Sequence, residues 1–261
     1  MAEPHHAHRP SADRPSDPGD LNDPQPIIWM RPERGARGPV PAYSRERIAE
    51  VAIALADGEG IEAVTMRRIA KELGTGAMTL YRYLPTKEDL YAVVIDQALG
   101  YEPQEPTGDV RADLATFARR YRETLRRHPW LAHAVASRPV MGPNMLRGNE
   151  RDLALVDGRG LSIDEMMQVV NLIRHWVTGA TQAETAEREA ALRSGMDRRT
   201  WQQRMGPYIG ELLATGRFPY LDRMVREARY PSRDERFETG LAVLLDGIEA
   251  RFPALAGRRR G

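Results

Sequence analysis

The chain has no cysteine, and only two of its 38 basic residues, Lys71 and Lys87, are lysines. Without cysteine it can form no disulfide, thiolate metal site or cysteine nucleophile. No apolar run approaches the ~18 residues that span a bilayer, and the first residues lack the apolar stretch of a signal peptide. We therefore expect a soluble protein of a reducing compartment, the cytoplasm, with no membrane partner.

The apolar content is nevertheless large enough for a sizeable core. Hydrophobic residues make up 41% and charged residues 29% of the 261 residues, which excludes a chain that is disordered throughout. The formal net charge is only +1. A nucleic acid would therefore have to be bound by a local arrangement of side chains and not by overall basicity. The length fits two domains, or one domain with a tail.

Residues 1–43 differ in composition from the rest of the chain. They hold many of the prolines and show no apolar periodicity outside residues 27–30, so we predict a disordered extension. Near its end, Arg31, Arg34 and Arg37 stand among proline and glycine residues that cannot form a helix. At the other end, residues 256–261 form a basic tail.

From Ser44 onward the apolar residues recur at helical spacing. Ser44 is a predicted N-cap, and Gly58 and Gly60 mark the predicted end of the first helix. Thr65 is placed to cap a second, short helix that ends at Gly74. The apolar stripes of these two helices are Ile48, Val51, Ala52 and Leu55, and Met66, Ile69, Ala70 and Leu73.

The rest of the chain is also predicted to be helical. A third short helix runs from Ala77 to Leu84, and the spacing of Thr86 and Asp89 predicts a cap that opens a fourth helix running to about Ala98. Two of the later helices, starting near 162 and 232, follow capping boxes. No stretch shows the sustained alternation typical of strands, so the predicted fold class is all-α. The later helices are predicted at 109–128, 143–157, 162–193, 198–215, 219–229 and 233–252.

The most informative segment is residues 64–90. Two short helices separated by a glycine-containing turn match the helix-turn-helix plan, and the second is short enough to insert its N-terminal end into a major groove. Leu80 and Leu84 would face the other helices. Thr79 can reach a base edge, while Ala77 and Met78 can contact thymine methyl groups.

Other side chains of this segment suit the DNA backbone. Tyr81 and Tyr83 can donate hydroxyl hydrogen bonds to phosphate oxygens, and Lys87 lies in the first turn of the next helix, beside free backbone N–H groups. Taken alone, each tyrosine could be a half-buried core aromatic and Lys87 a solvated charge; their combination in one unbroken stretch favours DNA binding. The predicted contacts are Thr65, Ala77, Met78, Thr79, Tyr81, Arg82, Tyr83 and Lys87.

Residues 44 to about 99 resemble the DNA-binding domain of the TetR family of bacterial transcription regulators. Tyr83 stands where many members have histidine, which keeps a hydrogen-bonding ring. The layout of residues 109–252, especially the ending from Phe237 to Ile248, is similar to the family's C-terminal domain. The residues that carry the first resemblance are Thr65, Ile69, Ala70, Leu73, Gly74, Thr79, Leu80, Tyr81, Tyr83, Lys87 and Leu90.

The resemblance implies a domain organisation and a function. Residues 44–100 are expected to form the DNA-binding domain, and residues 101–255 a helical ligand-binding and dimerisation domain. The resemblance implies a regulator, commonly a repressor, that binds a palindromic double-stranded DNA operator as a homodimer. An unidentified small-molecule effector would release it. No cofactor or metal is implied.

The last long helix offers a predicted dimer interface with the helix at 162–193, in a four-helix bundle. Gly240 and Gly247 lie seven residues apart on one face, where they would permit close helix approach. The alternative is that the same stripe packs within its own subunit. The predicted interface residues are Phe237, Gly240, Leu241, Leu244, Leu245, Gly247 and Ile248.

Two further sites are hypotheses. Arg31, Arg34 and Arg37 could follow the minor groove as a flexible arm, or could belong to a tail that only keeps the chain soluble. An effector pocket would be mostly apolar with a few polar groups, although aromatic and methionine residues at helical spacing are more often plain core. The predicted lining is Phe117, Tyr121, Trp130, Met141, Met167, Val170, His175 and Trp176.

An enzyme is the main alternative class of protein. His128 and His133 lie five residues apart, which does not place them on one helical face. The sequence has no H-E-x-x-H, no glycine-rich phosphate loop and no nucleophile elbow, so no catalytic residue is predicted. A third possibility is a DNA-binding dimer that senses no ligand; a solid core would favour it, and a closed apolar cavity of several hundred Å³ would favour sensing.

Overall fold

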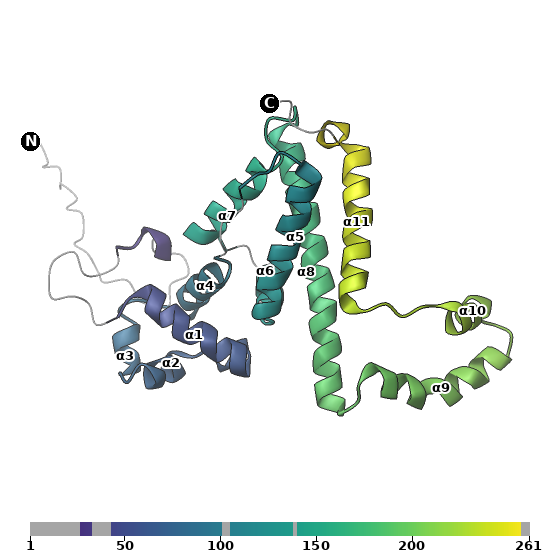
Figure 1. The fold of residues 1–261 in the computed structure, drawn as a ribbon. Helices are drawn as coiled ribbons and strands as arrows, with labels where there is room; N and C mark the ends of the chain where they lie inside the picture. Colours follow the sequence, from purple (N-terminus) through teal and green to yellow (C-terminus); the bar gives the residue numbers. More distant parts are fainter. Residues whose placement is uncertain (1–26, 33–42, 101–104, 138–139, 257–261) are drawn as a thin grey trace, which may run out of the picture. The chain divides into compact units, whose positions relative to one another are not determined.

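The computed structural model of the chain describes residues 27–32, 43–100, 105–137 and 140–256 (Figure 1). Within the segment predicted to be disordered, Ile28–Met30 form a single 3-10 turn, and the Ile28 side chain is buried. Arg34, Arg37 and the rest of the predicted extension up to residue 42 lie outside the described residues, as does the basic tail from residue 257.

The described part of the chain holds eleven α-helices and no strand, which confirms the all-α prediction. The first four are α1 (Arg45–Glu59), α2 (Met66–Glu72), α3 (Ala77–Leu80) and α4 (Lys87–Ala98). Helix α1 packs against α4 and α2, and α3 packs against α2. The centre of this cluster consists of fully buried side chains: Ile48, Ile69, Leu80, Leu84, Leu90 and Val94.

The predicted caps of this region are confirmed. The Ser44 hydroxyl accepts a hydrogen bond from the Arg47 N–H, and the Thr65 hydroxyl accepts one from the Arg68 N–H. Thr86 and Asp89 form a complete capping box at the start of α4. Each cap satisfies N–H groups that have no partner inside the helix, so the start of each helix is fixed by its own sequence.

Helix α3 is shorter than predicted. The prediction ran from Ala77 to Leu84, but the regular helix ends at Leu80. The Tyr83 N–H donates to the Leu80 carbonyl oxygen at 2.9 Å, which is the tighter 3-10 pattern. Pro85 follows Leu84 and disfavours a helical conformation in the residue before it, so the chain leaves the helix early.

The second region contains seven helices. They are α5 (Val110–Arg127), α6 (Leu131–Ser137), α7 (Pro143–Ala154), α8 (Ile163–Ser194), α9 (Arg198–Ala214), α10 (Pro219–Glu227) and α11 (Arg233–Arg251). Both predicted capping boxes, at Ser162 and Ser232, are present. Helix α6 was not predicted; like α2 it has seven residues, but the sequence before it offers no capping signal such as Thr65.

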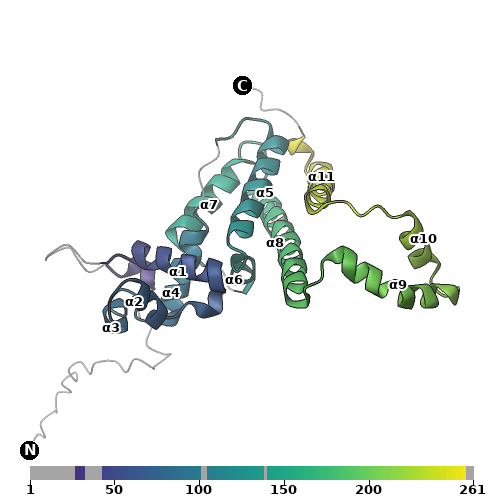
Figure 2. The same ribbon diagram turned by 60° about the horizontal axis from the view of Figure 1, so that its bottom comes forward.

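Helix α8 is the centre of the second region. It packs against α5, α6, α7 and α11, while α5 also contacts α11 (Figure 1). Helices α9 and α10 pack mainly against each other and project away from this bundle in both ribbon views (Figure 2). Helix α4 contacts α6 and α7 and so joins the first region to the second. No helix in the described ranges is both long and apolar enough to cross a bilayer.

Candidate DNA-binding surface and effector pocket

The residues predicted to contact DNA lie on the outside of the first region. Met78 is 77% exposed and Tyr81 is 42% exposed. Thr65, Arg82 and Lys87 are also exposed, whereas Ala77, Thr79 and Tyr83 are half-buried. The side chains of Leu80 and Leu84 are fully buried. Because buried leucines anchor one side of this segment, its opposite side is presented to the solvent in a fixed orientation.

Two side chains that the sequence analysis did not identify hold the backbone around this surface. The Tyr43 hydroxyl donates to the Leu73 carbonyl oxygen at 3.3 Å, and Arg45 Nε donates to the Tyr83 carbonyl oxygen at 3.3 Å. The first contact lies at the end of α2 and the second just after α3. They tie the turn after α2 and the segment after α3 to the start of α1. No periodic pattern in the sequence signals such side-chain-to-backbone bonds.

Charged groups around the surface are held in defined positions. Arg68 forms a two-fold hydrogen bond with Glu59, at 2.6 and 3.0 Å, and this pairing lowers the pKa of the Glu59 carboxyl. Lys87 Nζ lies 5.1 Å from the centre of the Tyr91 ring. The interaction with Tyr91 raises the pKa of Lys87 further above its ordinary value, and the ammonium lies at the N-terminus of α4.

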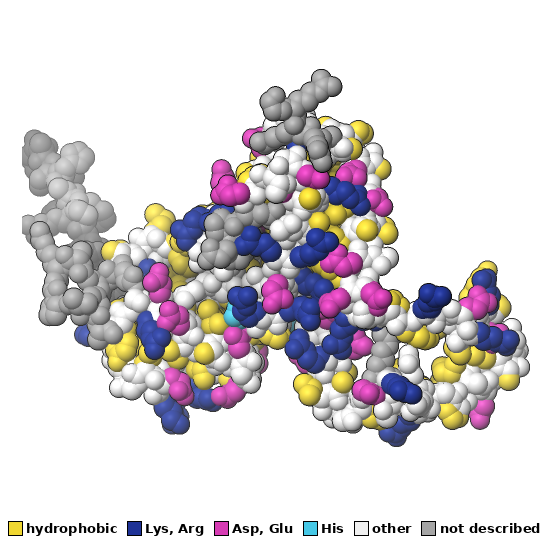
Figure 3. Space-filling view, in the orientation of Figure 1, with side chains coloured by type: hydrophobic (Ala, Val, Ile, Leu, Met, Phe, Trp, Pro, Cys, Tyr) yellow, Lys and Arg dark blue, Asp and Glu magenta, His cyan; other side chains and the backbone are white. Residues whose placement is uncertain are grey.

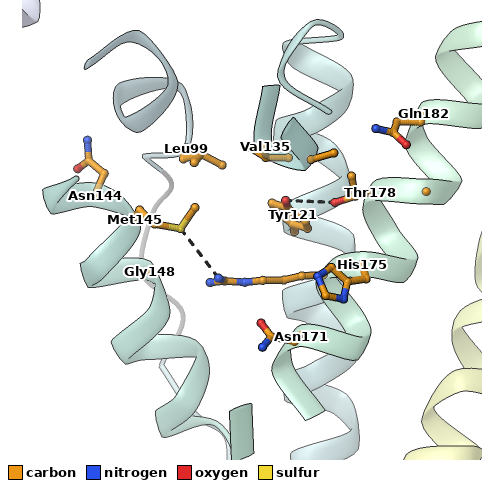
Figure 4. A pocket seen from close by; sticks show the side chains of 13 residues that line it. Leu99, Tyr121, Val135, Asn144, Met145, Gly148, Asn171, His175, Thr178 and Gln182 are labelled. Atoms are coloured by element: carbon orange, nitrogen blue, oxygen red, sulfur yellow. Dashed lines mark hydrogen bonds between the residues drawn. The ribbon is translucent and has the colours of Figure 1, made fainter. Parts of the chain in front are cut away.

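A cavity of about 480 Å³ lies in the second region, between the end of α4 and helices α5, α6, α7 and α8 (Figure 4). Its α8 wall is polar, whereas Leu99, Val135 and Met145 form an apolar wall. The full lining is Leu99, Tyr121, Val135, Ala136, Asn144, Met145, Gly148, Asn171, Arg174, His175, Thr178, Gly179 and Gln182.

Only part of the predicted lining faces this cavity. Tyr121 and His175 line it. Three of the other predicted residues are buried in the core, two lie on the surface, and one packs against α11. They are Phe117, Trp130 and Val170 in the core, Met141 and Met167 on the surface, and Trp176, whose ring centre lies 4.9 Å from that of Phe237.

The missed residues carry a recognisable pattern on α8. The missed Asn171, Thr178 and Gln182 recur at helical spacing together with the predicted His175, so the four form a polar stripe on a helix whose other stripe is apolar. The positions of aromatic and methionine residues do not predict such a polar stripe. Met145 and Leu99 come from distant parts of the chain, and no local sequence signal connects them to α8.

Hydrogen bonds fix several of the polar groups of the cavity. The Tyr121 and Thr178 hydroxyls lie 3.3 Å apart, and burial raises the pKa of Tyr121, so its phenol stays protonated. Gln182 Nε2 donates to the Ala132 carbonyl oxygen at 2.9 Å, which leaves its amide oxygen as an acceptor. Arg174 donates to Asn149 and to the carboxylate of Asp152, so the charge of the arginine is balanced within the protein.

The predicted dimer interface needs a correction. Phe237, Leu241, Leu245 and Ile248 are already buried within the single chain, where α11 packs against α5 and α8. Gly240 also serves this internal packing, because a Cβ atom at this position would lie 2.6 Å from Cζ2 of Trp176. These five residues follow the alternative in which the stripe packs inside its own subunit. Of the predicted residues, Gly247 is exposed, and Leu244 and Gly240 keep part of their surface accessible.

Two family models match the chain, one in each region. The model of the tetR family of bacterial regulatory proteins matches residues 48–94. The model of the tetracyclin repressor-like C-terminal domain matches residues 102–252. The two matches follow the division between the helix-turn-helix and the helices around the cavity.

Relatives and solved structures agree with these matches. The HTH-type transcriptional repressor DrrR1 of Streptomyces coeruleorubidus is 36% identical over 249 residues, which cover 93% of this chain and 89% of that protein. A regulator of Saccharopolyspora erythraea is 30% identical over 65% of this chain and 73% of its own length. ActR of Streptomyces coelicolor in complex with actinorhodin gives a TM-score of 0.69 at 27% identity, over 80% of this chain and 97% of ActR. The chain therefore belongs to the TetR family of bacterial transcriptional regulators, and it is a DNA-binding regulator and not an enzyme.

Proposed function

We propose that the protein is a homodimeric repressor that binds a palindromic operator and leaves it when a small-molecule effector fills the cavity. The observation that carries this proposal is the position of the cavity of about 480 Å³, whose wall includes Leu99 at the end of α4. Helix α4 is the last helix of the DNA-binding region. An occupant of the cavity therefore contacts the element that carries the helix-turn-helix.

On the DNA side, different residues have different roles. Thr79, Ala77 and Met78 read base edges and thymine methyl groups in the major groove. Tyr81, Tyr83 and Lys87, with Thr65 and Arg82, bind phosphates and set the position of the protein without reading sequence. The exposure of Met78, Tyr81 and Arg82 supports their place on the DNA-binding surface, since each of these side chains is accessible to DNA.

The N-terminal arginines supply a further contact in this proposal. Arg31, Arg34 and Arg37 follow the minor groove near the operator and add charge attraction without reading bases. Deletion of residues 1–43 is then expected to weaken operator binding and to flatten its salt dependence. Affinities measured at two salt concentrations test this, and an unchanged affinity at both would refute the arm.

The homodimer is supported by apolar surface that the single chain leaves open. Helices α9 and α10 carry exposed hydrophobic side chains, and Tyr220 is 83% exposed (Figure 3). On the bundle itself, Val243 of α11, which precedes Leu244 in the sequence, is 66% exposed, and Leu172 of α8 is 44% exposed. Large exposed apolar patches mark protein–protein interfaces, and a second copy of the chain is the partner that a two-fold operator requires.

The chemistry of the cavity supports an oxygenated aromatic effector. Residues 171–182 are twelve residues of α8 with a rise of about 16 Å between the first and the last, so the polar wall suits an elongated molecule with oxygen atoms along one edge. The facing wall of Leu99, Val135 and Met145 suits an apolar body. ActR, a similar protein of known structure, was solved with actinorhodin, and we propose a ligand of related character here.

Selection of bound sites from random duplex DNA tests the proposal. A homodimer with one recognition helix per subunit is expected to select a palindrome whose half-sites lie about one helical turn apart, 10–10.5 base pairs. Selection of a single half-site, or of no sequence at all, would contradict the proposal.

A further inference from the structure

A single carboxylate joins the DNA-binding region to the wall of the cavity. Asp96 lies on α4 and is only 3% exposed. Its Oδ1 accepts a hydrogen bond from the Met145 backbone N–H at 2.9 Å, and its Oδ2 accepts one from the Asn144 backbone N–H at 3.1 Å. Both donors belong to the first turn of α7. The side chain of one helix thus caps the N-terminus of another, 48 residues further along the chain.

The local sequence of α7 is adapted to this external cap. The N-cap residue is Gly142, which has no side chain to offer the helix. A Cβ atom at Gly142 would lie 2.2 Å from Cγ of Asp96, far closer than van der Waals contact allows. Glycine at this position therefore leaves the space that the Asp96 carboxylate occupies.

The capped residues also form the cavity wall. Asn144 and Met145 line the cavity (Figure 4), and Arg174 Nη1 lies 3.9 Å from Sδ of Met145 across it. Arg174 holds the next turns of α7 through Asn149 and Asp152. The first turn of α7 is thus fixed on one side by α4 and contacts the cavity on the other, so an occupant that shifts this turn must shift or break the bonds to Asp96.

We propose that Asp96 is the positioning residue through which occupancy of the cavity changes DNA binding. This inference rests on the proposed function, since it assumes that a filled cavity weakens operator binding. A second carboxylate that links the DNA-binding region to the second region offers a comparison. Asp57 of α1 accepts a hydrogen bond at 2.8 Å from Nε1 of Trp130, which lies just before α6. The Asp57 hydrogen bond links α1 to the start of α6. The Asp96 hydrogen bonds are instead made to Asn144 and Met145, which themselves line the cavity.

A side chain that fills the cavity replaces the unidentified effector in the test. Gly179 lines the cavity, and a Cβ atom built there meets no atom within 4 Å. Gly179→Trp therefore places an indole where an effector would lie, and Gly179→Ala serves as its small control. The operator affinity of the full-length protein is measured for both, in the unaltered chain and in Asp96→Asn, which keeps the shape of the side chain but only one acceptor oxygen.

We expect Gly179→Trp to weaken operator binding about tenfold in the unaltered chain, within the range of ordinary allosteric coupling. In the Asp96→Asn background the same substitution should change operator affinity less than about twofold, because the hydrogen bonds between α4 and the first turn of α7 are disrupted. The difference between the two backgrounds measures the coupling between the cavity and the DNA-binding region. A merely structural role of Asp96 would lower the melting temperature and leave the tenfold factor intact. Gly142→Ala crowds the Asp96 carboxylate without removing its charge, and it should also abolish the tenfold effect of Gly179→Trp on operator affinity.

The controls separate the outcomes. Asp109→Asn removes a capping carboxylate of α5, which accepts from the Ala112 N–H at 3.1 Å, and should leave the tenfold factor unchanged. The inference would be overturned if Gly179→Trp weakened operator binding equally with Asp96 and with Asn at this position. It would also be overturned if the weakening were lost in Asp57→Asn but kept in both Asp96→Asn and Gly142→Ala. No effect of Gly179→Trp in the unaltered chain would contradict the proposed function as well.

Discussion

At the scale of single residues, the recognition surface depends on which side chains are anchored and which are free. Leu80 is fully buried, whereas Met78, two residues earlier, is 77% exposed. This contrast could be predicted, because apolar residues at helical spacing must face the core. Trp176 shows the limit of such reasoning, since an aromatic residue predicted to bind an effector instead packs on Phe237 and over Gly240.

The division between positioning and reading residues predicts two different mutant phenotypes. Tyr81→Phe removes one hydroxyl donor from each of the two subunits, and each hydrogen bond contributes about 0.5–1.5 kcal/mol, so binding of the dimer to all operators should weaken by a similar factor, about 5- to 160-fold. Thr79→Val should reorder the preference among operators. Competition binding on a set of single-base operator variants tests both. The division of roles fails if Tyr81→Phe changes preference while Thr79→Val does not.

The two glycines of α11 predict opposite effects on stability. Gly240→Ala adds a methyl group 2.6 Å from the Trp176 ring, and overpacking of this kind costs about 1–3 kcal/mol. Gly247→Ala meets no atom within 4 Å of its Cβ and should stabilise the helix by about 0.5–1 kcal/mol. Urea unfolding midpoints measure both. Equal destabilisation by the two substitutions would show that Trp176 does not limit the space at Gly240.

At the scale of elements, local sequence signals determined where most helices begin. Ser44, Thr65, Ser162 and Ser232 all cap the helices predicted for them, because a cap requires only residues within one turn. Helix α6 was missed and α3 was predicted too long, since short helices depend on packing and on neighbouring turns more than on period. The lining of the cavity was mostly missed for a related reason, because it is assembled from five helices.

The capping boxes predict a loss of stability in acid. Hydrogen bonds with Ser162 and Ser232 lower the pKa of Glu165 and of Glu235 below the ordinary value of 4.5. As the pH falls below about 4.5 the unfolded chain takes up protons first, so the contribution of these carboxylates is complete above that pH and is lost as the pH falls through the lower folded-state values.

Urea midpoints of the unaltered chain and of the double variant Glu165→Gln, Glu235→Gln test this expectation between pH 7 and pH 3. The two midpoints should differ at pH 7 and converge in acid. Glu211→Gln, an exposed position on α9 outside any cap, should follow the unaltered chain throughout. If the urea midpoints of the double variant and of the unaltered chain differed by the same amount at every pH, this would contradict a role of these carboxylates in the pH dependence.

At the scale of the whole molecule, the α9–α10 segment has a surface that the single chain does not use. Its apolar side chains include Leu221 and Val225 of α10, both exposed. Leu221→Glu with Val225→Glu is therefore expected to leave helical content unchanged and to shift the dimer toward monomer by tenfold or more, on the order of 1.4 kcal/mol. Sedimentation across a concentration series measures this shift, and an unaltered dimer would remove α10 from the interface.

The central claim is that two copies of the chain present their helix-turn-helix surfaces together to one operator. The mass of the protein–DNA complex on the selected palindrome tests it most directly, with a duplex that carries one half-site as the comparison. Two protomers should bind the palindrome, and the single half-site should bind far more weakly. One protomer bound with equal affinity to both duplexes would contradict the account.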